Sequence, residues 1–137
     1  MAHFTLDQCT ALLPLVGAIA DEIVERRSEK HRLVRLRDRL EEHESPEGLT
    51  SSLAELDARI YELDTGLTTA TGEIEGLGLK LLRLNPLTIH FPGRTRNGEV
   101  VFCWQEGERS VCHGHAVGEE EEPRRPLKVR VVDVPKS

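Results

Sequence analysis

Cysteine and histidine side chains gather in the second half of the sequence, where their types could support metal or thiol chemistry. His90 and Cys103 are followed by the run Cys112-His113-Gly114-His115. Thiolate and imidazole groups are ligands that zinc and iron accept, and a carboxylate would also suit manganese. The spacing does not match the Cys-x-x-Cys pattern of zinc knuckles. A site would therefore have to form between strands.

Several arrangements of these groups are open. One is a site of two thiolates and two imidazoles, made by both cysteines with His113 and His115. Another is a zinc, iron or manganese ion held by His113 and His115 with a carboxylate, since residues two apart on a strand share a face. A third pairs His90 with a cysteine thiol as a dyad. The alternative without chemistry is small buried cysteines and surface histidines.

The elements that must position these groups are predicted to form a small antiparallel meander over residues 79–115. Alternating apolar residues mark the strands, and glycine, proline and polar residues mark the turns. Pro92-Gly93 is expected to end the second strand. The expected strands are 79–84, 88–91, 99–104 and 110–113.

The simplest registers place Phe91 opposite Val100 and Trp104 opposite Arg109, and they divide the side chains between two faces. The face expected to pack on helices collects Ile89, Phe91, Val100, Phe102, Trp104, Val111, His113 and His115. The other face collects His90, Val101, Cys103, Ser110 and Cys112. In this register the cysteines and the two C-terminal histidines point to opposite faces, so they could converge only through a bulge.

A long antiparallel helical hairpin, resembling a coiled coil, is predicted before the meander. Its helices are expected over residues 5–44, beginning at a Thr5–Gln8 capping box, and over residues 46–77, beginning at Pro46. Apolar residues of the second helix recur in alternating steps of four and three: Leu49, Leu53, Leu56, Ile60, Leu63, Leu67, Ala70, Ile74 and Leu77. Two helices alone leave apolar seams uncovered, so we expect a homodimer through the helices.

The charges of the two helices are complementary in an antiparallel pairing. The middle of the first helix is rich in arginine, and the second helix carries Asp57, Glu62 and Asp64 where the two would meet. We therefore expect ion pairs across the hairpin, each with a contribution of only a few tenths of a kcal/mol where it is exposed.

Length and composition indicate one α+β domain over residues 1–137, with an acidic loop and a candidate edge strand in 116–137. The net charge of −6 argues against nucleic-acid binding, even through the arginines of the first helix. No apolar run is long enough to span a membrane, and no signal peptide precedes the first helix. Three cysteines in such a chain favour a reducing, cytoplasmic location.

Motifs at both ends of the chain resemble one family. These are Phe4-Thr5-Leu6-Asp7-Gln8 with Ala11-Leu12-Leu13-Pro14-Leu15, His90-Phe91-Pro92, Cys103-Trp104 with Gly107-Glu108, His115, and Arg124 with Pro126-Leu127. With this spacing the chain resembles a bacterial family of uncharacterised proteins, domain-of-unknown-function family 2203, from Phe4 to Leu127. The family has no established activity.

The resemblance implies a set of polar site residues in the last third of the chain. Glu108, His115 and Arg124 lie beside Trp104 in the family pattern. A carboxylate, an imidazole and a guanidinium near one aromatic ring would form a ligand-binding or metal pocket at the edge of the sheet.

Two functions follow as hypotheses. The first is a cytoplasmic interaction or scaffold module that dimerises through its helical hairpin, without catalysis, and that could bind a protein partner. The second is a metal-binding or small hydrolytic protein with a site around Glu108, His113, His115 and Arg124.

Overall fold

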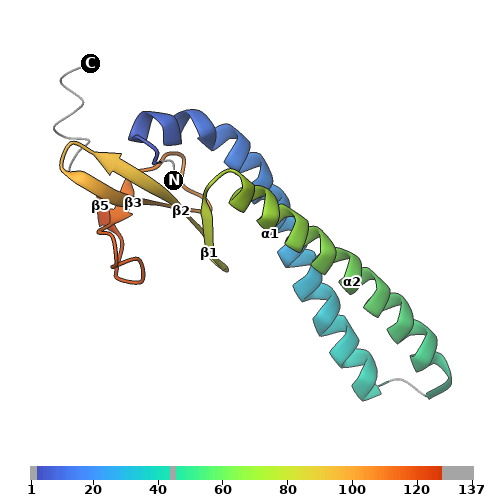
Figure 1. Ribbon diagram of the computed structural model, residues 1–137. Coiled ribbons are helices and arrows are strands. Elements are labelled where there is room, and N and C mark those ends of the chain that lie inside the picture. Colours follow the sequence, from blue (N-terminus) through green and yellow to red (C-terminus); the bar gives the residue numbers. More distant parts are fainter. Residues whose placement is uncertain (1–2, 44–45, 128–137) are drawn as a thin grey trace.

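The computed structural model describes residues 3–43 and 46–127, which form a helical hairpin and an antiparallel sheet (Figure 1). This confirms the predicted α+β fold. The helices are α1, Leu6–His43, and α2, Pro46–Gly76. The strands are β1, Lys80–Leu84; β2, Leu87–Thr95; β3, Gly98–Gln105; β4, His113–His115; and β5, Arg125–Pro126, in the sheet order β1-β2-β3-β4-β5. Neither helix is long and apolar enough to cross a membrane.

The start of α1 is fixed by the predicted capping box and by an attachment to the sheet. The Thr5 N–H donates to Gln8 Oε1 at 2.9 Å, and the Gln8 N–H donates to Thr5 Oγ1 at 3.2 Å. Just before the cap, the Phe4 N–H donates to the Pro92 carbonyl at 2.8 Å, and the Arg94 N–H donates to the Phe4 carbonyl at 2.9 Å. Residue 4 therefore extends the sheet beside β2 before the chain enters the helix.

The two helices pack along each other, and the end of α1 and the start of α2 lie far from the sheet (Figure 1). Charged side chains pair across them, as expected from the sequence. Arg37 Nε lies 2.6 Å from Asp57 Oδ1, and Lys30 Nζ lies 2.6 Å from Asp64 Oδ1. These pairs lie at the surface of the hairpin, where solvent screens them, so each contributes little to stability. The buried apolar side chains between the helices, such as Leu33 and Leu63, contribute more than these exposed pairs.

The hydrophobic core lies where the near ends of both helices cover one face of the sheet. Its helical members are Cys9, Val16, Ala20, Ile23, Leu67, Ala70 and Ile74. Its members from the sheet and adjoining segments are Leu79, Leu87, Ile89, Phe91, Phe102, Trp104, Val111 and Leu127. The prediction that the face bearing Phe91 and Trp104 packs on the helices is therefore confirmed.

Strand β2 runs through Pro92-Gly93 to Thr95, so the prediction that this pair ends the strand is wrong. The Pro92 carbonyl accepts from Phe4, which shows that Pro92 turns its backbone polar groups away from β3. Its missing N–H therefore costs no hydrogen bond in the β2–β3 ladder.

The predicted register also differs from the observed one. Phe91 pairs with Phe102, and the strand expected at 110–113 is instead β4, in which Val101 pairs with His115 and Cys103 with His113. The turn after β3 is closed by its own side chain, because Glu108 Oε1 accepts the Gln105 N–H at 2.8 Å. Trp104 consequently does not pair with Arg109. The candidate edge strand over 127–134 falls almost wholly outside the described residues.

Candidate metal centre

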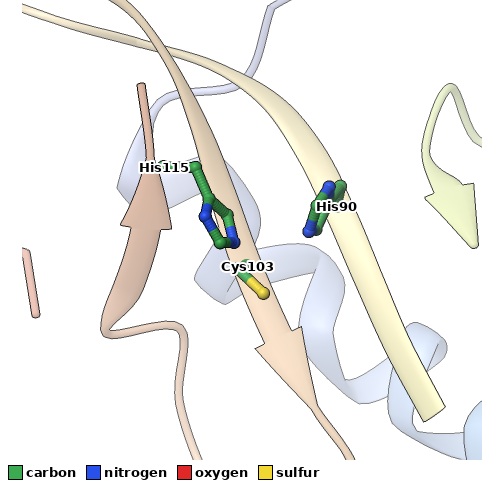
Figure 2. A group of neighbouring side chains, drawn as sticks. All are labelled: His90, Cys103 and His115. Carbon is green, nitrogen blue, oxygen red and sulfur yellow. The ribbon is translucent and has the colours of Figure 1, made fainter. Parts of the chain in front are cut away.

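Three side chains from three neighbouring strands converge on the face of the sheet that lies away from the helices (Figure 2). His90 of β2 pairs directly with Cys103 of β3, and Val101, two residues before Cys103, pairs with His115 of β4. Paired residues and residues two apart share a face of a sheet. His90, Cys103 and His115 therefore all project to the same side.

The donor atoms of this cluster lie close together and are shielded from solvent. One ligand atom from each of His90, Cys103 and His115 lies within 4.8 Å of the others. The side chains are 2%, 0% and 6% exposed, respectively. The two imidazole rings are tilted by 49° with centroids 5.0 Å apart, so both rings face one small region above Cys103.

Most of the imidazole nitrogens in the cluster lack a hydrogen-bond partner. Both ring nitrogens of His90 and Nδ1 of His115 are buried without a partner among residues 3–43 and 46–127. Each such group costs about 1–3 kcal/mol when it is removed from water without compensation. A metal ion bound between the rings would satisfy these nitrogens, and an imidazole–thiolate set suits zinc or iron. The residues present fit a metal.

Burial keeps the two imidazoles of the cluster in the neutral form that a metal ion binds. It lowers the pKa of His90 to about 4, and it also lowers the pKa of His115, so both rings are neutral donors. Burial raises the pKa of the Cys103 thiol, while a hydrogen bond from Arg124 opposes this change. Metal binding at Cys103 would displace the thiol proton.

Arg124 donates hydrogen bonds to Cys103 and to the residues around it. Its Nε donates to Cys103 Sγ at 3.2 Å and its Nη2 donates to the Cys103 carbonyl at 3.2 Å. Nη2 also donates to Glu108 Oε1 at 2.6 Å, and Nη1 donates to Gln105 Oε1 at 3.1 Å. Burial alone would raise the pKa of Glu108, but the hydrogen bonds from Arg124 and the Gln105 amide bring it below its ordinary value.

The residues shortlisted from the sequence fall around this network. His113 Nδ1 lies 3.5 Å from Glu108 Oε2, a contact that does not have hydrogen-bond geometry. Trp104 is on the helix-facing side, and its Nε1 donates to the Glu108 carbonyl at 3.0 Å. The structure thus brings Glu108, His113 and Arg124 together directly beside Cys103.

The cluster itself differs from the metal sets considered from the sequence. The predicted separation of cysteines and histidines onto opposite faces is wrong, because His113 and His115 share the face of Cys103. His90 and Cys103 do share a face, as predicted. Together with His115 they are the potential ligands. Cys112 and His113 are not members of the converging group found in the described part of the chain. The cluster of His90, Cys103 and His115 could have been found from the sequence only if the register of β3 against β4 had been known.

Together these elements define an α+β protein in which a helical hairpin covers one face of an antiparallel sheet and a buried cluster of one cysteine and two histidines lies on the other. A family model described as an uncharacterized conserved protein, DUF2203, matches residues 2–127, and the chain belongs to this family. Comparisons with curated proteins and with solved structures gave no match.

Proposed function

We propose that this protein binds a divalent transition metal through His90, Cys103 and His115. The observation that supports this function is the convergence of three buried donor groups within 4.8 Å, two of them imidazoles with unpartnered nitrogens. A neutral buried histidine without a hydrogen bond is costly, and two such rings facing one thiol are best explained by a shared ligand.

Zinc is the ion that best fits this donor set. One thiolate and two imidazoles are typical zinc ligands, and donors around a tetrahedral zinc lie roughly 3.5 Å apart at its usual bond lengths. The observed separations of up to 4.8 Å need only a small side-chain adjustment to reach that geometry. Iron and manganese are weaker matches, because manganese in particular prefers oxygen ligands.

Metal content of untagged protein tests the proposal directly. We expect about one zinc per chain by elemental analysis and native mass spectrometry. Cys103→Ser replaces only the sulfur atom by oxygen, and this variant should lose the zinc. Cys112→Ser is the matched control and should retain the metal, since Cys112 lies outside the converging group. Circular dichroism of each variant shows whether the fold persists. Wild-type protein that gains neither zinc nor thermal stability on zinc addition would overturn the proposal.

We also propose that the hairpin pairs with a second copy of the chain. Several apolar side chains in the outer part of the hairpin are only partly covered: Val34, Leu36, Leu40, Leu53, Leu56 and Ile60. Tyr61 lies among them with 73% of its surface exposed. Two such hairpins packed around a two-fold axis would form a four-helix bundle that covers these side chains.

The oligomeric state separates this second proposal from simple helix stability. Tyr61→Lys should shift the native mass from dimer to monomer while the helical content stays the same, because Tyr61 is exposed within one chain. Leu63→Asp should instead unfold the hairpin, since Leu63 is 2% exposed. A wild-type protein that is monomeric at all concentrations would exclude the dimer.

A reducing cytoplasm is the compartment that we propose, since it would keep the three cysteines as thiols.

A further inference from the structure

A metal held by three protein ligands at this site would need a fourth ligand, and the local charge selects its type. A divalent ion with one thiolate and two neutral imidazoles carries a net positive charge, which is costly in a buried site. The surrounding face adds more positive charge. Lys80 pairs with His90 across β1 and β2, and Arg83 pairs with Thr88, which shares the face of His90. An anionic fourth ligand would offset this charge.

Most carboxylates of the sheet region are already committed to other partners. Glu99 lies 3.3 Å from His3, Glu106 binds Arg27 at 2.8 Å, and Glu108 binds Arg124 at 2.6 Å. The remaining carboxylates within residues 77–127 are the acidic run Glu119–Glu122. This run lies in the loop that leaves His115 and returns to β5, so it begins at the cluster itself.

Glu120 is distinguished from its three acidic neighbours by its surroundings. It is half-buried, whereas Glu119, Glu121 and Glu122 are exposed. Glu120 lies five residues after His115 and four residues before Arg124, whose Nε donates to Cys103 Sγ. The Gly118 N–H donates to Glu120 Oε2 at 3.0 Å, which orients the carboxylate. Hydrogen bonds of this kind commonly orient carboxylates that ligate metals.

We propose that Glu120 is the fourth metal ligand and completes a four-ligand centre with His90, Cys103 and His115. This inference rests on the metal-binding function proposed above. The second observation behind it is His90, which is 2% exposed and has both ring nitrogens buried without a partner among the described residues. Glu120 lies outside the group of atoms that converge within 4.8 Å, so its ligation would draw the loop over residues 116–124 against the sheet.

The proposed centre has a definite chemical character. Thiolate and carboxylate together balance the charge of a divalent ion, so the whole centre is neutral. Four protein ligands leave no position for water or substrate, which is the arrangement of structural zinc sites rather than of catalytic ones. Of the four residues of the acidic run, Glu120 is thus the one that binds the metal. Metal binding at this centre stabilises the fold instead of activating a substrate.

Glutamine substitutions in the acidic run provide matched tests. Zinc affinity is measured by competition with a chromophoric chelator on untagged full-length protein. We expect Glu120→Gln to weaken zinc binding at least about tenfold, on the scale known for groups around metal sites. Glu121→Gln has the same charge change in the same loop and should bind zinc like wild type. Equal affinities for the two variants would overturn the assignment of Glu120 while leaving zinc binding by the other three residues intact.

Cobalt substitution and proteolysis give readouts independent of affinity. Tetrahedral cobalt bound by wild type should have a visible spectrum that added acetate or phosphate does not change, whereas Glu120→Gln should respond to these anions. A wild-type spectrum that shifts with the anion would show an exogenous fourth ligand and refute the inference. Zinc should also protect the acidic run from a glutamate-specific protease in wild type and Glu121→Gln, but not in Glu120→Gln. Wild type that binds neither metal would refute both proposals together.

Discussion

Arg124 Nε lies 3.2 Å from Cys103 Sγ, so a residue near the end of the chain's last described loop donates directly to the thiol at the centre of the cluster. The loop that carries Glu120 begins after His115 and ends at Arg124, and both of these residues border Cys103. The acidic loop is therefore attached to the cluster at both ends, although its own residues 116–119 are exposed.

Replacing Arg124 should weaken metal binding while preserving the fold. The guanidinium stabilises the thiolate form of Cys103 and fixes its carbonyl, and loss of such a partner around a metal site typically costs 10–100-fold in affinity. We therefore expect Arg124→Gln to bind zinc about 10–100-fold more weakly. Arg124→Lys should recover only part of this loss, because an ammonium lacks the planar fork. Arg125→Gln, an exposed neighbour, is the control and should match wild type.

Glu106 should contribute stability that disappears in acid. Its carboxylate receives hydrogen bonds from Arg27 at 2.8 and 3.2 Å, which together with the Leu87 amide lower its pKa below the ordinary value of 4.5. A lowered pKa in the folded state stabilises the protein above pH 4.5, and this contribution is lost as the pH falls through the folded-state pKa. Glu106→Gln should therefore destabilise the protein at neutral pH by about 1–3 kcal/mol.

The measurement is urea unfolding of both proteins at neutral pH and again well below the ordinary glutamate pKa. The stability difference between wild type and Glu106→Gln should shrink in acid. An exposed substitution, Glu55→Gln, should change little at either pH. A difference that stays constant with pH would show that Glu106 acts through packing rather than through its charge.

The three thiols should differ sharply in reactivity. Burial raises the pKa of the Cys9 thiol to about 12, and Cys9 and Cys103 are both fully buried. Cys112 is only partly buried and lies 3.3 Å from Ser110 Oγ. Only the thiolate reacts with alkylating reagents, so native protein should label first at Cys112. Peptide mapping after brief labelling checks this, and Cys112→Ser should remove the fast phase. Labelling of Cys9 at the same rate would contradict the packing of α1 on the sheet.

Two glycines should respond in opposite ways to alanine. A methyl group at Gly93 would overlap the ring of Phe102, which is fully buried. Gly93→Ala should destabilise the protein by about 1–3 kcal/mol through overpacking. Gly72 lies on the exposed side of α2 with nothing within 4 Å of an added Cβ, so Gly72→Ala should stabilise it by about 0.5–1 kcal/mol. Thermal unfolding of the pair measures both effects, and equal shifts would contradict the placement of Phe102.

The helical half of the molecule was predictable because its signals are local. The Thr5–Gln8 capping box, the proline at position 46 and the heptad seam each depend on residues within a few turns of one another. They placed both helices to within one residue of the observed ends. The pairing of Arg37 with Asp57 followed from the antiparallel geometry alone.

The site could not be predicted as well, because its residues come together through strand register. Alternation of apolar residues in β2 and β3 assigned their faces correctly, but nothing in the sequence of 106–112 showed how long the turn before β4 would be. Starting β4 at His113 instead of Ser110 moved two histidines to the opposite face of the sheet. The cluster of one cysteine and two histidines therefore required the observed pairing of Val101 with His115.

The backbone bridge between Phe4 and the Pro92–Arg94 segment has a consequence for how the chain folds. The helical hairpin and the β2–β3 hairpin each form from residues close in sequence, so they can assemble early and independently. The bridge joins residues far apart in the chain, and the entropy of closing so long a loop makes it a late event. During synthesis, the amino terminus could dock only after residues 92–94 had been made. Formation of this bridge is thus expected after both hairpins have formed.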